Sequence, residues 1–330
     1  MMRSERRELP LNWYRLAAAA LAALAASAAF AQTGPSSLRD PGTPILFAPG
    51  VVSTGDIEFA PAFEPDMKTV YFVKGSPGAK RVMWILVSRL SGIRWSTPEI
   101  ATFSGQYSDI DPTLSPDGRK LFFASNRPAE GTAPRKDFDL WVVEKTAGGW
   151  SAPRNLGAPV NSAGSETTTS VTSDGTLYFA SGAREANRPG RRLYRSKLVD
   201  GRYTTPEPLP PPVDGGEEDS NQYVAPDGRY LIYFSKRPGA SEPSLFVSYP
   251  ESGGWTAPEN LSERLNADYA PYTPLVSPDG KALYFTSQKG AFDHPPVGPM
   301  PYDKFEDLMH APGNGLADIY WIDIKALRLR

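Results

Sequence analysis

The chain has 330 residues, a formal net charge of −2, 34 prolines, 29 glycines and no cysteine. The near-neutral charge excludes the clustered basic surface that nucleic-acid binding needs, so we expect no nucleic acid as a partner. The absence of cysteine excludes disulfides, thiol catalysis and thiolate metal sites.

The N-terminal segment has the three parts of a secretory signal peptide. Basic residues precede an alanine- and leucine-rich run over 16–29, and Ala29-Phe30-Ala31 supplies two small residues for cleavage. We expect a signal peptide over 1–31, a linker over 32–42 and one domain over 43–330. The mature chain would have no transmembrane segment and would be periplasmic or secreted from a bacterial cell.

One turn signature recurs along the rest of the chain, and its fullest form is Ser115-Pro116-Asp117-Gly118. Proline presets φ at the second position of a turn, aspartate bonds back to the backbone, and glycine takes the left-handed position. The signature therefore predicts a hairpin turn in each of five repeats. The turn aspartates, which are 51 to 57 residues apart, are Asp66, Asp117, Asp174, Asp227 and Asp279.

Each turn is followed by a continuous apolar run such as 121–124, by a second apolar strand such as 140–143, and by an aromatic-x-x-Pro unit such as 150–153. A continuous apolar run indicates a strand buried on both faces, and proline belongs on an edge strand. We name the strands a, b, c and d, with the signature turn between a and b. The pattern predicts four-stranded units over about 58–105, 109–160, 166–213, 217–263 and 268–325.

The fifth unit stops after strand c, and the segment 43–48 has the pattern of the missing strand d. Pairing of the two ends would close a ring and leave no exposed sheet edge. The predicted fold class is therefore all-β, a β-propeller of five four-stranded blades with N- and C-terminal strand closure. Six blades are the alternative, which would require a further repeat.

The second unit contains the most complete copy of the repeat. It reads Ser115-Pro116-Asp117-Gly118-Arg119-Lys120-Leu121-Phe122-Phe123-Ala124-Ser125-Asn126-Arg127, then Asp139-Leu140-Trp141, then Trp150-Ser151-Ala152-Pro153. This pattern resembles the WD-like Pro-Asp repeats of the TolB-like β-propellers of bacterial envelope proteins, over about residues 44–325. The resemblance implies a propeller that binds rather than catalyses, because that family is mostly non-catalytic.

Strand order places the variable loops on one face, which we call the top face. It holds the d–a connections and the b–c loops, and the signature turns lie on the opposite, bottom face. A carboxylate recurs eight residues before the turn aspartate in four units, where it would surround the top mouth of the channel, and Pro271 has that place in the fifth. The predicted binding residues are Glu58, Asp109, Glu166, Asp219 and Asp268, with Arg127 and Arg237 just past strand b.

Two interpretations of these acids remain open. As a ring they could hold a cation, a basic group or a hydroxyl-rich ligand. Alternatively, the acids form blade-to-blade bonds, in which each caps backbone N–H groups or pairs with Arg127, Arg237 or Lys289 just past strand b. We expect no cofactor, with a bound cation such as calcium as the alternative.

Asp109 and Asp111 are candidates for chemistry, because alternate residues of a strand point to the same side. Two carboxylates on one face are what glycoside hydrolysis requires. This pair supports the alternative that the chain is a glycoside hydrolase or another carbohydrate-active enzyme.

His294 and His310 are the only histidines, and both lie in the longest b–c loop, over 288–317. A catalytic triad or a three-histidine metal site could form only through this loop. We expect a short helix over 302–310, whose Phe305, Leu308 and Met309 dock the loop over the top face. His294 and His310 complete the predicted set of binding residues.

No nucleophile–base pair, metal-ligand spacing or phosphate loop stands out in the sequence. The expected function is therefore that of an exported, non-catalytic binding or scaffolding protein. Its top face would recognise an envelope protein, a peptide or a glycan.

Overall fold

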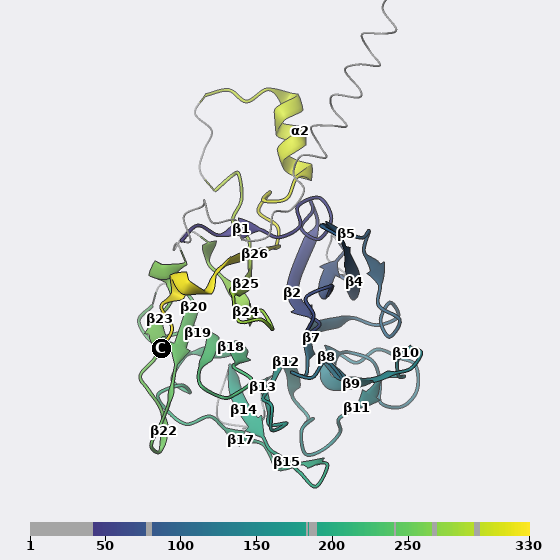
Figure 1. The fold of residues 1–330 in the computed structure, drawn as a ribbon, viewed down its shortest axis with the longest axis vertical. Coiled ribbons are helices and arrows are strands. Elements are labelled where there is room, and N and C mark those ends of the chain that lie inside the picture. Colours follow the sequence, from purple (N-terminus) through teal and green to yellow (C-terminus); the bar gives the residue numbers. More distant parts are fainter. Residues whose placement is uncertain are drawn as a thin grey trace, which may run out of the picture.

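The computed structural model describes residues 42–76, 81–182, 184, 190–240, 242–265, 269–293 and 298–330. In these residues the chain forms five antiparallel sheets around a central axis, each with its first strand innermost (Figure 1). This arrangement confirms the predicted five-bladed β-propeller. The predicted signal peptide and most of the predicted linker lie outside the described residues.

The blades follow one another in chain order. The first contains β2 (Ile57–Phe63), β3 (Thr69–Gly75), β4 (Met83–Ser91), β5 (Arg94–Trp95) and β6 (Glu99–Ile100). The second contains β7 (Asp109–Leu114), β8 (Lys120–Ser125), β9 (Asp139–Thr146), β10 (Gly149–Trp150) and β11 (Arg154–Asn155). The third contains β12 (Ser165–Val171), β13 (Leu177–Gly182), β14 (Arg191–Ser196) and β17 (Glu207–Pro208), with a small hairpin of β15 (Leu198–Val199) and β16 (Arg202–Tyr203).

The fourth blade contains β18 (Glu218–Val224), β19 (Leu231–Lys236), β20 (Ser244–Ser248) and β23 (Glu259–Asn260), with a hairpin of β21 (Pro250–Glu251) and β22 (Gly254–Trp255). The fifth contains β24 (Tyr272–Val276), β25 (Ala282–Ser287), β26 (Asp318–Asp323) and, from the other end of the domain, β1 (Ile45–Leu46). The described residues also form three helical segments: η1 (Ser262–Arg264), α2 (Tyr302–His310) and η3 (Ile324–Leu327).

The N-terminal strand closes the ring, as predicted. Ile45 pairs with Trp321 and Leu46 pairs with Tyr320, so β1 is the outer strand of the fifth blade. The N–H of Phe47 donates to the carbonyl of Ile319 at 2.8 Å and extends the pairing by one bond. Closure satisfies backbone groups that an open edge would expose to other chains.

The signature turns have the predicted chemistry. In the second blade, the hydroxyl of Ser115 donates to Asp117 at 2.6 Å, and the N–H of Gly118 donates to the carbonyl of Ser115 at 2.8 Å. Gly118 has φ of 68°, the left-handed conformation that glycine adopts without a steric penalty. The first blade has Met67 at this place, with φ of 60°.

The hydrophobic core lies between the blades. Phe122 packs into the seam between the second and third blades, whereas its neighbour Phe123 packs into the seam between the first and second. Both rings are at most 1% exposed. Successive residues of a strand point to opposite faces, so a strand packed between two blades must be apolar at every position. This is the physical reason for the continuous apolar runs.

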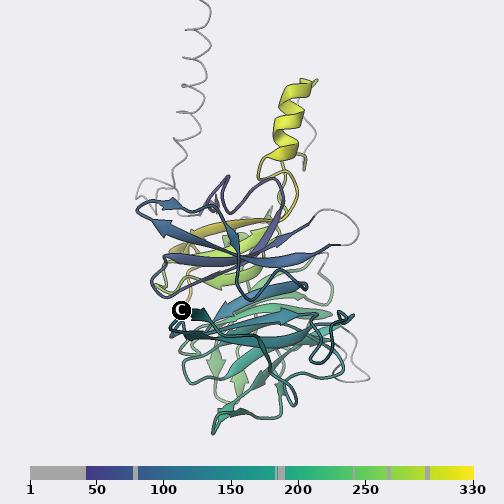
Figure 2. The ribbon, with the colours of Figure 1, turned by 90° about the vertical axis from the view of Figure 1, so that its right-hand side faces the viewer.

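The helix α2 lies where the sequence predicts a helix, but its packing differs from the prediction. No residue of α2 is buried, and the helix projects away from the blades (Figures 1 and 2). The expectation that it docks over the top face is wrong, because its apolar residues do not contact the propeller core. Within the described residues, no helix is long and apolar enough to cross a membrane.

Candidate binding sites along the propeller axis

The four predicted carboxylates at the starts of the inner strands are completely buried. Glu58, in β2, accepts hydrogen bonds from the N–H and the hydroxyl of Thr54 and an ion pair from Lys74 at 2.8 Å. Thr54 belongs to the connection that enters the blade. The acid therefore fastens that connection to the end of β3.

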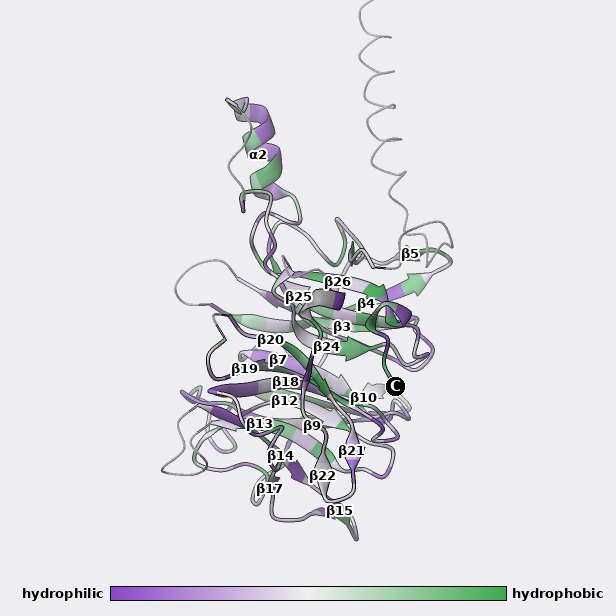
Figure 3. Ribbon diagram, turned by 90° about the vertical axis from the view of Figure 1, so that its left-hand side faces the viewer, coloured by the Kyte–Doolittle hydropathy of each residue, from purple (hydrophilic) through white to green (hydrophobic). Residues whose placement is uncertain are grey.

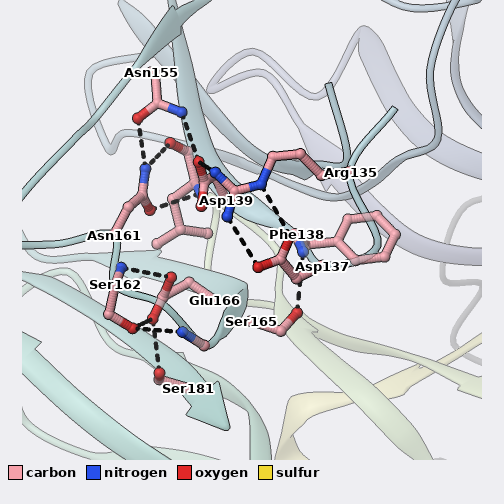
Figure 4. Close-up of polar contacts among 12 residues, drawn as sticks. Arg135, Asp137, Phe138, Asp139, Asn155, Asn161, Ser162, Ser165, Glu166 and Ser181 are labelled. Atoms are coloured by element: carbon pink, nitrogen blue, oxygen red, sulfur yellow. Dashed lines mark hydrogen bonds and ion pairs between the residues drawn. The ribbon is translucent and has the colours of Figure 1, made fainter. Parts of the chain in front are cut away.

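Glu166 has the same role in the third blade. It accepts hydrogen bonds from the N–H and hydroxyl of Ser162, at 3.1 and 2.5 Å, and from the hydroxyl of Ser181 at 2.8 Å (Figure 4). Arg184 adds an ion pair at 3.2 Å. Figure 4 also shows Asp139 at the top of the second blade, where its carboxylate accepts hydrogen bonds from the side chains of Arg135 and Asn155.

Asp109 forms a buried ion pair with Arg127 at 2.7 Å and accepts from the hydroxyl of Ser104 at 2.6 Å. The guanidinium of Arg127 also lies over the rings of Phe123 and Trp141, at 4.9 and 5.4 Å. Burial raises the pKa of Asp109, and the charge of Arg127 opposes that rise. Cation–π contacts and a charge-assisted hydrogen bond together hold Arg127 inside the scaffold.

Asp219 accepts from the hydroxyl of Ser235 at 2.6 Å and from the N–H of Gly216 at 3.1 Å. Arg237 does not pair with it directly, and donates to the carbonyls of Pro212 and Val213. The four described acids thus bond to groups of the scaffold, and Asp219 also lies 3.9 Å from the guanidinium of Arg192 in the third blade.

The fifth blade differs, and Asp268 lies outside the described residues. A carboxylate from another strand, Asp318 at the start of β26, is completely buried here and accepts from the N–H of Gly313 at 2.7 Å. Burial raises its pKa to about 7, and the negative charge of Glu58 adds to that rise. The repeat did not predict Asp318, because this residue lies on strand c and outside the recurring position.

A second ring of residues lies two positions further along each inner strand, and of its members the sequence had indicated only Asp111. Every inner strand has a β-bulge here, and the bulged residue is a non-glycine residue with φ between 40° and 53°. Such residues are uncommon in this conformation, and bulges of this kind redirect side chains. In the sequence, the bulged residue is found six residues before each turn aspartate. The five bulged residues are Ala60, Asp111, Thr168, Asn221 and Thr273.

These five residues line a cavity of about 110 Å³ on the propeller axis. Four prolines of the signature turns also line the cavity, namely Pro65, Pro116, Pro226 and Pro278. Because these turns lie on the bottom face, the cavity opens towards that face. Thr168 is engaged with Gln222 through two hydrogen bonds, of 2.8 and 3.1 Å. Asp111 is 8% exposed and accepts the N–H of Thr168 at 3.3 Å, and burial raises its pKa to about 6.

The candidate catalytic residues Asp109 and Asp111 have separate surroundings. Asp109 bonds to Arg127 of its own blade and to Ser104 of the connection from the first blade, whereas Asp111 accepts from the third blade and lines the channel. The left-handed bulge at Asp111, with φ of 53°, interrupts the strand alternation on which the predicted pair depended.

A second pocket, of about 210 Å³, lies at the top between the first and fifth blades, and we call it the mouth pocket. Its wall is mainly apolar, with one cation and two neutral polar groups. Burial raises the pKa of the Tyr272 phenol in this wall. The lining residues are Ile57, Phe59, Gly75, Arg81, Met83, Tyr272, Gln288, Leu316 and Ala317.

The histidines do not form a site in the described part of the chain. His310 is exposed at the end of α2, 3.8 Å from Glu306, and His294 lies outside the described residues. Among the described residues there is no group of three or more His, Cys, Asp or Glu side chains that could hold a metal ion.

No family model matches the chain, and no curated protein sequence does so either. Solved structures share its fold at low sequence identity. TolB from Acinetobacter baumannii is 17% identical, with a TM-score of 0.48, over 81% of this chain and 57% of that one. A GH43 endo-arabinanase from Bacillus licheniformis is 13% identical, with a TM-score of 0.46, over 81% and 94%. The catalytic domain of a GH62 α-L-arabinofuranosidase from Coprinopsis cinerea is 11% identical, with a TM-score of 0.45, over 83% and 91%.

This chain therefore spans 57% of the length of that TolB.

Proposed function

We propose that this chain is an exported, non-catalytic binding protein whose top face binds a protein or peptide. The distribution of exposed hydrophobic side chains supports this proposal. Of the nine exposed large hydrophobic side chains in the described residues, six belong to the b–c loops of two adjacent blades, the first and the fifth. They are Val82, Phe292, Tyr302, Phe305, Met309 and Leu316.

Apolar side chains gathered on one region of a soluble protein are typical of a protein-binding site. Leu316 and the neighbours of Val82 also line the mouth pocket, so the exposed residues continue into a concave surface. Arg81 at its edge adds a cation that can pair with a carboxylate of the partner. A protein or peptide fits this combination better than a glycan, because the surface offers few polar groups for sugar hydroxyls.

The geometry of the carboxylates supports binding over hydrolysis. A glycoside hydrolase needs two carboxyl groups that flank one bond. Asp109 is engaged with Arg127, and Asp111 lines the channel without a second carboxylate among the described residues that line it. Export, and a location in the envelope, rest on the N-terminal sequence pattern.

Site-specific photo-crosslinking in the producing cell tests the proposal. Benzoylphenylalanine at position 305 or 316 is expected to form an adduct with a discrete protein. The matched control is position 199, since Val199 is 51% exposed in the β15–β16 hairpin away from the top loops. The adduct at 316 should be lost when Phe305→Ser and Met309→Ser are combined. Equal labelling at all three positions would refute a top-face site.

A polysaccharide panel tests the enzymatic alternative. The binding proposal predicts no release of reducing sugar from any substrate. Turnover that disappears in both Asp109→Asn and Asp111→Asn would establish hydrolysis instead.

A further inference from the structure

The cavity on the propeller axis contains a carboxylate without a counterion. No Lys, Arg or His of the described residues forms an ion pair with Asp111, and its only hydrogen bond comes from the N–H of Thr168 at 3.3 Å. The nearest cationic influence is Arg191, which is exposed and paired with Glu218 at 3.3 Å. A buried carboxylate is costly unless it is paired, so this position favours a cationic ligand.

A second free polar group lies at the same level of the ring. The side-chain amide of Asn221, on the bulge of the fourth blade, has no hydrogen-bond partner among the described residues, and it lines the same cavity. Among the other polar side chains of the lining, Thr168 and Gln222 bond to each other and Thr113 donates to the backbone carbonyl of Thr169, whereas the buried hydroxyl of Thr169 has no partner among the described residues. Asp111 and Asn221 therefore provide acceptors that a ligand can use.

The wall also has an apolar part. Ala60, Ala62 and Leu114 line the cavity together with the prolines that follow three of the bulges: Pro61, Pro112 and Pro274. The volume of about 110 Å³ holds several water molecules or a short alkyl chain. A carboxylate beside apolar side chains matches a group that has a charged head and a hydrocarbon stem.

We propose that this channel binds a primary alkylammonium group, from a lysine side chain or a small free amine, with Asp111 as its counterion and Asn221 as a second acceptor. The ammonium head has three donors and no acceptor, which suits two oxygen acceptors and a polar backbone. The site opens to the bottom face and goes beyond the proposed protein-binding role of the top face.

A divalent metal ion suits the site less well. Calcium takes six to eight oxygen ligands, with several carboxylates in strong sites. The described residues that line the cavity offer one carboxylate, Asp111.

The direct test is calorimetric titration of the full chain with n-butylammonium chloride at pH 7.5. Saturable binding is expected, with affinity lowered at least about tenfold in Asp111→Asn and less in Asn221→Ala. Asp117→Asn is the matched control, because Asp117 is an exposed acid of a bottom-face turn. Butylammonium binding that is unchanged in Asp111→Asn would overturn the proposal.

Titrations with other ligands show what the site recognises and whether the ammonium group comes from a lysine side chain or a free amine. n-Butanol should bind much more weakly than butylammonium, and equal binding would make the site merely apolar. Calcium chloride that binds and displaces butylammonium at far lower concentration would make it a metal site and also overturn the proposal. If Nα-acetyl-lysine methylamide binds as butylammonium does, a lysine side chain can enter; if only the free amine binds, the ligand is a small amine.

A pH series on the wild-type chain keeps the test independent of any folding defect in the variant. The N–H of Thr168 contacts Asp111, and the phenol of Tyr272 and the guanidinium of Arg191 interact electrostatically with its carboxylate at longer range. None of them changes charge between pH 5 and 8, so butylammonium affinity should fall as the pH drops below about 6 and Asp111 takes up a proton. Constant affinity over this range would contradict the role of Asp111.

Discussion

The N–H of Thr168 donates to the carboxylate of Asp111 at 3.3 Å, from the bulge of the third blade to the bulge of the second. This bond is the only one that Asp111 receives from the described residues, and it leaves most of the negative charge uncompensated. The strand bulges thus create a charged position inside the channel where regular strands would not.

The first prediction concerns the pH dependence of stability. The pKa of Asp111 is about 6 in the folded chain and about 3.9 when unfolded, so the folded state binds more protons between these values. Its contribution to the unfolding free energy therefore falls as the pH rises from about 4 to 6. Asp111→Asn removes the charge and should stabilise the protein by about 1–3 kcal/mol at pH 8, with little gain near pH 4.

Urea unfolding at pH 4.5, 6 and 8 measures this difference. Asp318, whose raised pKa acts in the same direction, is present in both proteins, so the comparison isolates Asp111. A difference that does not change with pH would show that Asp111 is not the titrating group.

The second prediction concerns Arg127, which is buried with Asp109, the two side chains being 11% and 0% exposed. Arg127→Ala leaves a buried carboxylate without its partner and should cost about 3–5 kcal/mol. The control is Arg89→Ala, since Arg89 and Glu99 are 59% and 74% exposed, and it should cost less than about 1 kcal/mol. Chemical denaturation measures the unfolding free energy of both variants. Similar losses would show that the Asp109–Arg127 pair stabilises the protein no more than an exposed ion pair does.

Ring closure gives the third prediction. Phe47, just after β1, has ring centroids 5.3–5.5 Å from those of Phe63, Trp95 and Tyr284. Phe47→Ala should cost about 3–5 kcal/mol, because it leaves a cavity where the two ends of the ring meet. Phe292→Ala, at a residue 37% exposed, should be nearly neutral in the same urea titration. Equal effects would mean that closure contributes little to stability.

The fourth prediction concerns α2, whose apolar and polar residues alternate along the projecting helix (Figure 3). Replacing 302–310 with a Gly/Ser linker should change the unfolding free energy by no more than about 0.5 kcal/mol, because no residue of α2 is buried. The crosslink from position 316 should nevertheless be lost. Lys304→Ala, which retains the helix, should keep the crosslink, and a large loss of stability in the linker variant would show that α2 packs on the propeller.

The sequence contained most of the information about the fold, because the relevant signals are local. Ser115-Pro116-Asp117-Gly118 codes for its turn through bonds within five residues, and the run 121–124 is apolar because each strand is packed on both faces. The helix over 302–310 was also predictable from nine consecutive residues. Its packing was not, since an amphipathic pattern is the same whether its apolar side meets the core or another molecule.

The candidate sites depended on longer-range geometry. The position of Glu58, Asp109, Glu166 and Asp219 in the repeat was visible, but their partners were set by loops and strand ends that fold back onto them. Asp318 could not be predicted from the repeat, because it lies on a different strand from the recurring acids.

The sequence by itself determined the repeat, the number of blades and the closure by the N-terminal strand, since each follows from turn chemistry and from the period of apolar residues. Only the tertiary structure decided which acids are internal and which one faces the channel. A single extra residue in each inner strand, held at positive φ, redirects the side chains that follow. The carboxylate of Asp111 accepts a hydrogen bond from the N–H of Thr168 in the next blade, so its surroundings depend on residues far from it in the chain.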